Sequence, residues 1–182
     1  KSTVAVNLSK ALCEKGYNTG LLDVDIHGPS VMKMLGMDND RLVSDEKGIQ
    51  VLTAEDGLKV VSMAALLETP DTPLVWRGPM KSGVINQFLS DVYWPELDYL
   101  VIDSPPGTGD EPLSVIQLIP DVKGVLIVTT PQEIALLDVR KCISFARKLN
   151  VPVLGIIENM SGIICPHCKK EFSLFSGSGV QK

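Results

Sequence analysis

Two cysteines stand three positions apart near the end of the chain, in the segment GIICPHCKKEF at residues 162–172. A Cys-x-x-Cys pair offers two thiolate ligands to one metal centre, whereas a closed zinc or iron–sulfur site needs four. Cys165 and Cys168 therefore make half of a metal site. The spacing alone fits zinc and iron–sulfur chemistry equally well, and for zinc either His167 or a second chain would complete the shell.

The other two cysteines are poor candidates for the missing ligands. Cys13 and Cys142 lie in stretches with helical apolar periodicity, where a lone cysteine usually packs as a small hydrophobic side chain. Four cysteines in 182 residues are too few for the disulfide framework of a small secreted domain, and the first residues do not resemble a signal peptide. We therefore expect a reducing, cytoplasmic environment.

Aspartates end two of the apolar runs of the chain. In VIDSPPGTGDE a hydrophobic run delivers Asp103, and the Pro- and Gly-containing turn after it includes Gly107, whose backbone N–H can face a terminal phosphate. This is the arrangement of a Walker B carboxylate with a switch loop. In LLDVDIHGPS, Asp23 and Asp25 are close enough to serve a magnesium ion and its waters together. Taken singly, each aspartate is more often a helix cap or a solvated turn residue.

The first three residues favour the nucleotide interpretation of these aspartates. A phosphate-binding loop ends in Lys followed by Ser or Thr at the start of a helix; the lysine reaches the β and γ phosphates and the hydroxyl binds magnesium. Lys1, Ser2 and Thr3 match this ending and precede a helical stretch. The glycine-rich part of such a loop and its preceding strand are absent from the sequence, which predicts a chain that starts within its phosphate loop.

The elements that must position these residues follow from the apolar pattern. Nearly continuous apolar runs bounded by Gly, Pro or Asp predict strands buried on both faces. Helical periodicity lies between the runs, at Val4–Lys15, closed by Gly16, and at Glu133–Lys148. Strands that alternate with helices predict an α/β fold with parallel βαβ units, in which ligands bind at the carboxyl ends of the strands. The predicted strands lie within residues 18–25, 97–107, 123–131 and 151–160, with a further strand within 55–63.

Composition limits the partners of the chain. Its hydrophobic content of 45% is ample for the core of one domain of ordinary size. A formal net charge of −5 without a basic block argues against nucleic acid, because phosphate neutralisation needs clustered Lys and Arg. The longest apolar runs are too short to cross a bilayer, so we expect a soluble protein with no membrane partner.

Seven segments, in this order along the chain, resemble the Mrp-type P-loop ATPases, the iron–sulfur cluster carrier and scaffold branch of the deviant Walker A superfamily. The segments are KSTVAVNLSKAL, DVDIHGPS, WRGPMKSG, DYLVIDSPPGTGDE, VTTPQEIALLDVRK, ENMSG and CPHC. The resemblance implies a P-loop NTPase fold with a mostly parallel β-sheet flanked by helices on both faces. It also implies a single nucleotide-binding domain over residues 1–182, lacking the first strand, most of the phosphate loop and part of the C-terminal end.

The resemblance assigns roles to the residues around the phosphates. Lys1, Ser2 and Thr3 would bind phosphates and magnesium, with Lys1 also serving catalysis. Asp23 would support the magnesium shell, and Asp103 would be the Walker B carboxylate.

It also assigns roles to four further residues. Asp25 would orient or activate the attacking water, since phosphoryl transfer depends mostly on positioning and charge stabilisation. Asn159 would face the nucleotide base, although a strand-end Asn is often only a turn former. Thr130 and Pro131 would line the same pocket.

For the cysteine pair, the resemblance favours a cluster over zinc. In a two-fold symmetric homodimer two half-sites meet, so four thiolates would hold one bridging [4Fe-4S] cluster. The resemblance thus implies a slow, Mg2+-dependent ATPase that binds ATP and transfers the cluster to apo iron–sulfur proteins. The alternative is a nucleotide-switched positioning or adaptor ATPase with a structural zinc site. A basic surface or an amphipathic membrane helix would have supported that alternative, and the sequence offers neither.

Overall fold

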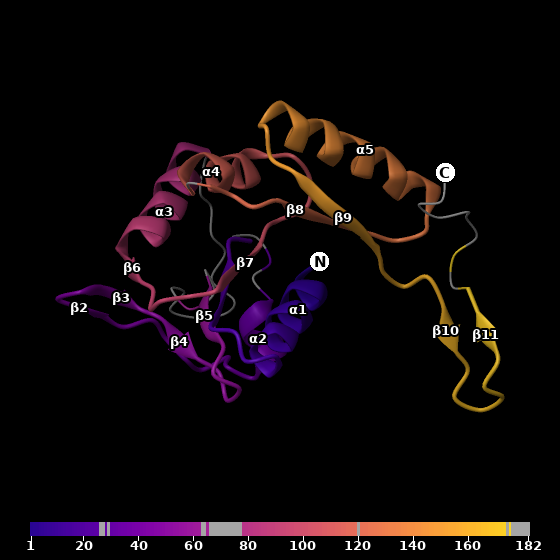
Figure 1. Cartoon of the computed structure of the whole chain (residues 1–182), viewed down its shortest axis with the longest axis horizontal. Coiled ribbons are helices and arrows are strands. Elements are labelled where there is room, and N and C mark those ends of the chain that lie inside the picture. Colours follow the sequence, from indigo (N-terminus) through magenta and orange to yellow (C-terminus); the bar gives the residue numbers. More distant parts are fainter. Residues whose placement is uncertain are drawn as a thin grey trace. The chain divides into compact units, whose positions relative to one another are not determined.

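The computed structural model describes residues 1–25, 28, 30–62, 65, 78–119, 121–173 and 175. Contacts divide the chain into two compact units, Lys1–Pro120 and Asp121–Lys182, and each is described by itself (Figure 1). One domain over residues 1–182 stays a prediction. The start of the WRGPMKSG segment, at Trp76 and Arg77, and the last seven residues lie outside the described residues.

The larger unit is built on a four-stranded sheet in the order β4-β5-β1-β7. The central strand β1 (Thr19–Asp23) runs parallel to β5 (Lys59–Ser62) and to β7 (Tyr99–Asp103), and β4 (Leu52–Thr53) is antiparallel to β5. These three parallel strands confirm the strands predicted within residues 18–25, 55–63 and 97–107. All five residues of β1 are buried, as expected for a strand covered on both faces.

Helices cover both faces of this sheet. Successive side chains of a strand point to opposite sides, so neighbouring residues of β1 pack against different helices. Leu21 packs in one cluster with α1 (Ser2–Glu14) and α2 (Val31–Leu35), whereas Leu22 packs in another with α3 (Gly78–Asp91) and α4 (Asp110–Leu118). Both leucines are fully buried, which stabilises the fold by about 1.5–3 kcal/mol for each side chain. The centre of the sheet is therefore a firm support for residues at the strand ends.

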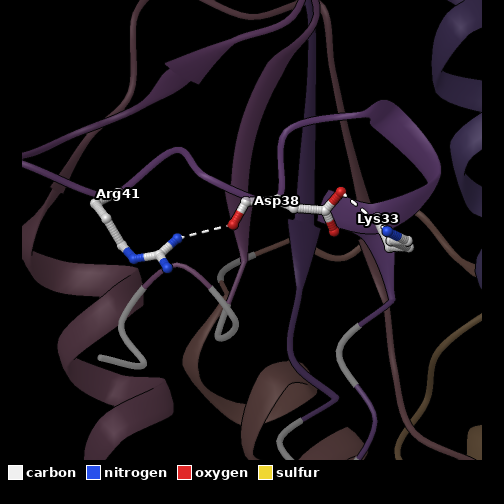
Figure 2. Close-up of polar contacts among 3 residues, drawn as sticks. All are labelled: Lys33, Asp38 and Arg41. Carbon is white, nitrogen blue, oxygen red and sulfur yellow. Dashed lines mark hydrogen bonds and ion pairs between the residues drawn. The ribbon is translucent and has the colours of Figure 1, made fainter. Parts of the chain in front are cut away.

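The carboxyl end of α2 is fixed by local contacts. Gly36 adopts the left-handed conformation that commonly ends a helix, with φ 71°. Figure 2 shows the next anchor, in which Arg41 Nη1 donates a hydrogen bond to the carbonyl oxygen of Asp38 at 2.9 Å. The carboxylate of Asp38 in turn lies 3.3 Å from Lys33 Nζ on the helix itself. Both side chains of that ion pair are exposed, so the pair stabilises this region less than the hydrogen bond to the Asp38 carbonyl does.

A small sheet in the order β2-β3-β6 completes the larger unit. Its strands are β2 (Ser44–Asp45), β3 (Gly48–Gln50) and β6 (Val92–Tyr93). The polar stretch that contains β2 and β3 thus pairs with the chain that follows α3, since β3 runs parallel to β6. No helix in the described part of the chain is both long and apolar enough to cross a membrane.

The smaller unit is a βαβ arrangement followed by a hairpin. Strands β8 (Val125–Thr129) and β9 (Val153–Glu158) are parallel and are joined by α5 (Glu133–Lys148), which has the predicted bounds. The expectation that both strands are buried on both faces was wrong, since Leu126 and Leu154 are 42% and 61% exposed. The described part of this unit contains a single helix, which covers one face of the pair. The hairpin consists of β10 (Ile163–Ile164) and β11 (Glu171–Phe172).

Candidate functional site

Three polar side chains form a row at the carboxyl ends of β5, β1 and β7. In the strand register Asp23 lies opposite Ser62 on one side and opposite Asp103 on the other. All three are buried, with Asp23 at 0% and Asp103 at 4% exposure. The prediction that Asp23 and Asp103 end strands is confirmed, and the structure makes these two strands neighbours. A buried carboxylate is costly unless hydrogen bonds or opposite charges compensate it. The contacts of each carboxylate therefore show which of its oxygens is still available to a ligand.

Asp23 is held by hydrogen bonds on both carboxylate oxygens. Its Oδ2 accepts from the Ser62 hydroxyl at 2.9 Å, and its Oδ1 accepts from the backbone N–H of Asp25 at 3.1 Å. The backbone N–H of Val31, the first residue of α2, also hydrogen-bonds to this carboxylate. Burial raises the pKa of Asp23 to about 7, and the negative charge of Asp103 adds to the rise, which these hydrogen bonds oppose.

Asp103 keeps one oxygen open. Burial raises the pKa of its carboxyl, and a hydrogen bond from the Ser2 hydroxyl opposes that rise. Its Oδ2 is buried and has no hydrogen-bond partner among the described residues. An unsatisfied buried oxygen is costly to a fold, so such an atom is a strong candidate for contact with a bound ion or water.

The amino end of α1 lies beside Asp103. Lys1 is the N-cap residue of this helix, and its positive charge favours the ionised form of Asp103. Ser2 reaches the same carboxylate, so the structure brings Ser2 and the charge of Lys1 to the residue predicted as the Walker B carboxylate. Thr3 is exposed in the first turn. The amino end of a helix carries unpaired N–H groups and a partial positive charge, which favours anions.

Asp25 and Gly107 lie on the loops that leave β1 and β7. Asp25 is half-buried, its Oδ1 accepts a hydrogen bond from the backbone N–H of Gly28 at 3.1 Å, and its charge acts on Asp103. Gly107 is exposed and has φ 97°, a conformation that side chains with a Cβ rarely adopt. A Cβ at this position would meet nothing within 4 Å, so the backbone conformation rather than space favours glycine.

In the smaller unit, Asn159 lies at the carboxyl end of β9. Its backbone N–H donates to the carbonyl of Thr129 at 2.8 Å, which brings it to the end of β8, where Thr130 and the buried Pro131 follow. The side-chain Oδ1 of Asn159 accepts the N–H of Met160 at 2.9 Å. Asn159 thus makes the local contact expected of a turn former, and its role toward a nucleotide base stays a prediction.

The cysteine pair lies in the tight turn of the β10–β11 hairpin. The backbone N–H of Cys165 donates to the Lys170 carbonyl, and the N–H of Lys169 donates to the Cys165 carbonyl, both at 2.9 Å. Hydrogen bonds from the backbone N–H groups of Cys168 and His167 lower the pKa of the Cys165 thiol. A thiolate supported in this way is a good metal ligand, because metals bind the deprotonated sulfur.

Within the described ranges, no group of three or more His, Cys, Asp or Glu side chains is arranged to hold a metal ion. The turn therefore offers two thiol ligands, Cys165, which is half-buried, and Cys168, which is exposed. Cys13 and Cys142 are half-buried in α1 and α5, as predicted for cysteines that pack within helices. The half-site inferred from the sequence remains half a site in the folded chain.

The sequence analysis did not single out Ser62. It is the polar residue that ends the strand predicted within residues 55–63, the same position that Asp23 and Asp103 occupy in their strands. The same rule would have found it. Its partner, however, depends on the register that places it opposite Asp23, which no local pattern specifies.

Comparison with known proteins places these features in context. Residues 1–182 match the model of a family described as "ParA: NUBPL iron-transfer P-loop NTPase". The chain is 53% identical over 182 residues to a Methanocaldococcus jannaschii protein named iron-sulfur cluster carrier protein, covering 100% of this chain and 63% of that protein. It is 50% identical over 183 residues to the cytosolic Fe-S cluster assembly factor Nubp2 homolog 2 of Drosophila yakuba, covering 98% and 70% respectively.

A solved structure also resembles the chain. The nucleotide-binding protein of Archaeoglobus fulgidus, in complex with ADP, matches with a TM-score of 0.83 and 37% sequence identity over 97% of this chain and 68% of that one. The match confirms the predicted P-loop NTPase fold with a mostly parallel sheet flanked by helices. The chain spans about 63% of the length of the Methanocaldococcus jannaschii relative.

Proposed function

Because the chain belongs to the ParA family of P-loop NTPases, we propose that it is a Mg2+-dependent ATPase that carries an iron–sulfur cluster and transfers it to apo iron–sulfur proteins. One observation carries the proposal: an unsatisfied, buried carboxylate oxygen at a helix amino end occurs in the same chain as a Cys-x-x-Cys turn. The names of the two relatives, a cluster carrier and a cytosolic assembly factor, support the cargo and a cytoplasmic location.

The oxygen donors of the larger unit fit Mg2+. This ion is bound by one or two carboxylates together with substrate phosphates and keeps several waters, so a cage of protein ligands is not needed. We propose that Ser2 and Asp103 hold it and that Asp23 supports its waters. The open Oδ2 of Asp103 supports this assignment. Bound there, Mg2+ would neutralise charge on the phosphates of ATP.

The chain's own groups would then position ATP. The ammonium of Lys1, the hydroxyl of Thr3 and the N–H groups at the start of α1 would bind the phosphates, and the Gly107 N–H would donate to the terminal one. The carboxylate of Asp25 would accept a hydrogen bond from the attacking water and hold it in line with the breaking bond.

The base of the nucleotide would be bound by residues of the smaller unit, in a single nucleotide-binding domain over residues 1–182. Asn159 would face the base, and Thr130 and Pro131 would line its pocket. The arrangement of these three at the adjoining ends of β8 and β9 supports a shared role. The ADP complex of the Archaeoglobus fulgidus relative supports nucleotide binding as such.

The cluster would be held between two copies of the chain. Two thiolates from each copy would supply the four ligands of one [4Fe-4S] cluster, because a two-fold axis brings identical half-sites together. Exposed apolar side chains on the hairpin support an interface here, since they would shield the cluster from water. They are Ile163 at 38%, Ile164 at 64% and Phe172 at 49% exposure. A formal net charge of −5 supports protein recipients rather than nucleic acid.

Metal analysis of the reconstituted protein tests the cargo. After anaerobic reconstitution we expect about four iron and four sulfide per dimer in the wild type. The double variant Cys165→Ser, Cys168→Ser should lose them. The matched control Cys13→Ser, Cys142→Ser should keep them, because those cysteines pack inside helices. Stoichiometric zinc without cluster uptake would contradict the carrier function and favour a nucleotide-switched adaptor with a structural zinc site.

A second experiment tests the coupling of ATP to transfer. Asp25→Asn keeps the size of the side chain and removes the carboxylate that would hold the water. It should abolish ATP hydrolysis and change the rate or extent of cluster transfer to an apo iron–sulfur protein. Transfer at the wild-type rate and extent without hydrolysis would show that ATP turnover does not gate release.

A further inference from the structure

Ser62 is a fully buried hydroxyl in contact with the proposed nucleotide site. It ends β5, and its Oγ donates a hydrogen bond to Asp23 Oδ2 at 2.9 Å. The strand register fixes this pair, since Ser62 and Asp23 are Cα partners on adjacent parallel strands. Neither magnesium nor phosphate binding as proposed above uses this hydroxyl.

Asp23 connects Ser62 to the loop that carries Asp25. The Asp23 carboxylate accepts the backbone N–H of Asp25, just after β1, and that of Val31, at the start of α2. One carboxylate therefore fixes both ends of the segment between β1 and α2. The carboxyl end of α2 is closed separately by Gly36, which adopts the left-handed conformation.

The orientation of the Asp23 carboxylate depends on its hydrogen bonds. Rotation of an aspartate carboxylate about χ2 is broad, so the backbone alone does not hold its plane. The Ser62 hydroxyl anchors Oδ2, which leaves Oδ1 directed at the N–H of Asp25. A hydrogen bond from a neutral donor to a buried charged acceptor is stronger than an exposed one, because water does not compete for it.

The two neighbouring carboxylates differ in what they leave open. Both oxygens of Asp23 accept hydrogen bonds from the protein, whereas Oδ2 of Asp103 has no partner among the residues that the structure describes. This contrast favours direct contact with the ligand for Asp103, and it gives Asp23 a role in organising the loop beside its proposed support of the magnesium waters.

We propose that Ser62 is a positioning residue for ATP hydrolysis, acting through Asp23 on the backbone of the loop that carries Asp25. The inference rests on the proposed function, in which Asp25 holds the attacking water. It predicts that loss of the Ser62 hydroxyl lowers the rate of hydrolysis more than the affinity for nucleotide. The phosphate contacts assigned above lie on α1 and the β7–α4 loop, whereas Ser62 ends β5 and donates its hydrogen bond to Asp23.

Three variants test this role. Ser62→Ala removes the donor, Ser62→Thr keeps a hydroxyl, and Val60→Ala is the matched control, a truncation of a fully buried side chain on the same strand whose register partner is Leu21 rather than Asp23. Four quantities are measured for each: kcat for ATP hydrolysis, Kd for ADP with Mg2+, the thermal unfolding midpoint, and amide hydrogen exchange of Asp25 in the nucleotide-free protein.

For Ser62→Ala we expect kcat to fall about tenfold or more, with Kd for ADP changed by less than about threefold. The Asp25 amide should exchange about tenfold faster than in the wild type, because its acceptor is no longer held. Ser62→Thr should restore kcat and slow exchange. Val60→Ala should lower thermal stability while kcat and Asp25 exchange stay near wild type.

Wild-type kcat and wild-type Asp25 exchange in Ser62→Ala would overturn the inference and leave the proposed function intact. Equal losses of kcat, affinity and stability in Ser62→Ala and Val60→Ala would also overturn it, as the role would be purely structural. Absence of ATP hydrolysis in the wild type would refute the proposed function instead. In that case the exchange rate of the Asp25 amide decides whether Ser62 positions the loop.

Discussion

Asp23 and Asp103 are direct neighbours across the β1–β7 ladder, and both carboxylates are buried. Burial raises the pKa of each, and the charge of Asp103 adds to the rise at Asp23. Two neighbouring negative charges that are both shielded from water repel each other, so binding of a cation or a proton is favoured there. The relationship makes the site responsive both to magnesium and to pH.

The first prediction concerns the magnesium dependence of nucleotide binding. Asp103→Asn keeps the shape of the side chain but removes its charge, so Mg2+ should no longer strengthen ADP binding by the wild-type factor. We expect a loss of about tenfold or more in ADP affinity with Mg2+ present and a much smaller loss in EDTA, measured by isothermal titration calorimetry. Asp138→Asn, on an exposed face of α5, is the matched control. Equal losses with and without Mg2+ would contradict the assignment of Asp103.

The second prediction is a pH dependence of stability that comes from Asp23. In the folded protein without metal or nucleotide, burial raises its pKa from the ordinary 3.8 to about 7. Between these values the folded state binds more protons than the unfolded state, so this residue lowers the free energy of unfolding as the pH rises from about 4 to about 7. Over this pH range the decrease in the free energy of unfolding is on the order of 4 kcal/mol.

Asp23→Asn should remove this dependence. The variant's free energy of unfolding, relative to the wild type, should rise between about pH 4.5 and about pH 7.5 in magnesium-free buffer. Urea denaturation at several pH values checks it, with Asp138→Asn as the control for a general charge effect. A difference that stays constant with pH would show that Asp23 titrates normally.

The third prediction concerns thiol reactivity. Hydrogen bonds from the backbone N–H groups of Cys168 and His167 lower the pKa of Cys165, and the thiolate is the reactive form. In the metal-free protein, iodoacetamide should therefore label Cys165 faster than Cys13 or Cys142, both half-buried in helices. Its labelling should also persist to lower pH. Site-resolved mass spectrometry gives the rates, and labelling of Cys13 as fast as Cys165 would contradict the prediction.

The fourth prediction compares two glycines. Gly107 has φ 97°, so Gly107→Ala should destabilise the fold by about 1–2 kcal/mol through backbone strain. Gly83 lies inside α3, where an added Cβ meets nothing within 4 Å, so Gly83→Ala should stabilise by about 0.5–1 kcal/mol. Urea denaturation without nucleotide measures both. Changes of the same sign would show that the helix or the turn differs from the structure.

The elements that the sequence predicts correctly are those that a local pattern of residues specifies. The apolar runs that end in Asp23 and Asp103 marked β1 and β7, because a strand buried on both faces needs such a run. Helix α5 has strong apolar periodicity and a basic last turn, and its bounds were predicted correctly. By contrast, α3 begins with Gly78 and Pro79 and contains Gly83, which obscure a helical pattern.

The short strands were missed for a different reason. Strands β2, β3, β4, β6, β10 and β11 have two or three residues, too few for a periodic pattern. They exist through pairing: β3, for example, runs beside β6, which is distant in the sequence. The contact between Ser62 and Asp23 belongs to the same class, since it depends on strand register rather than on residue type.

The hairpin that carries the cysteine pair has a thermodynamic consequence. Its two strands have two residues each and expose Ile164 and Phe172, so opening it locally should require far less free energy than opening the buried strand β1. A ligand that binds both thiolates binds only the closed hairpin, and it therefore stabilises that form by mass action. Loading of a cargo and ordering of this hairpin are then linked as one equilibrium, in which each step favours the other.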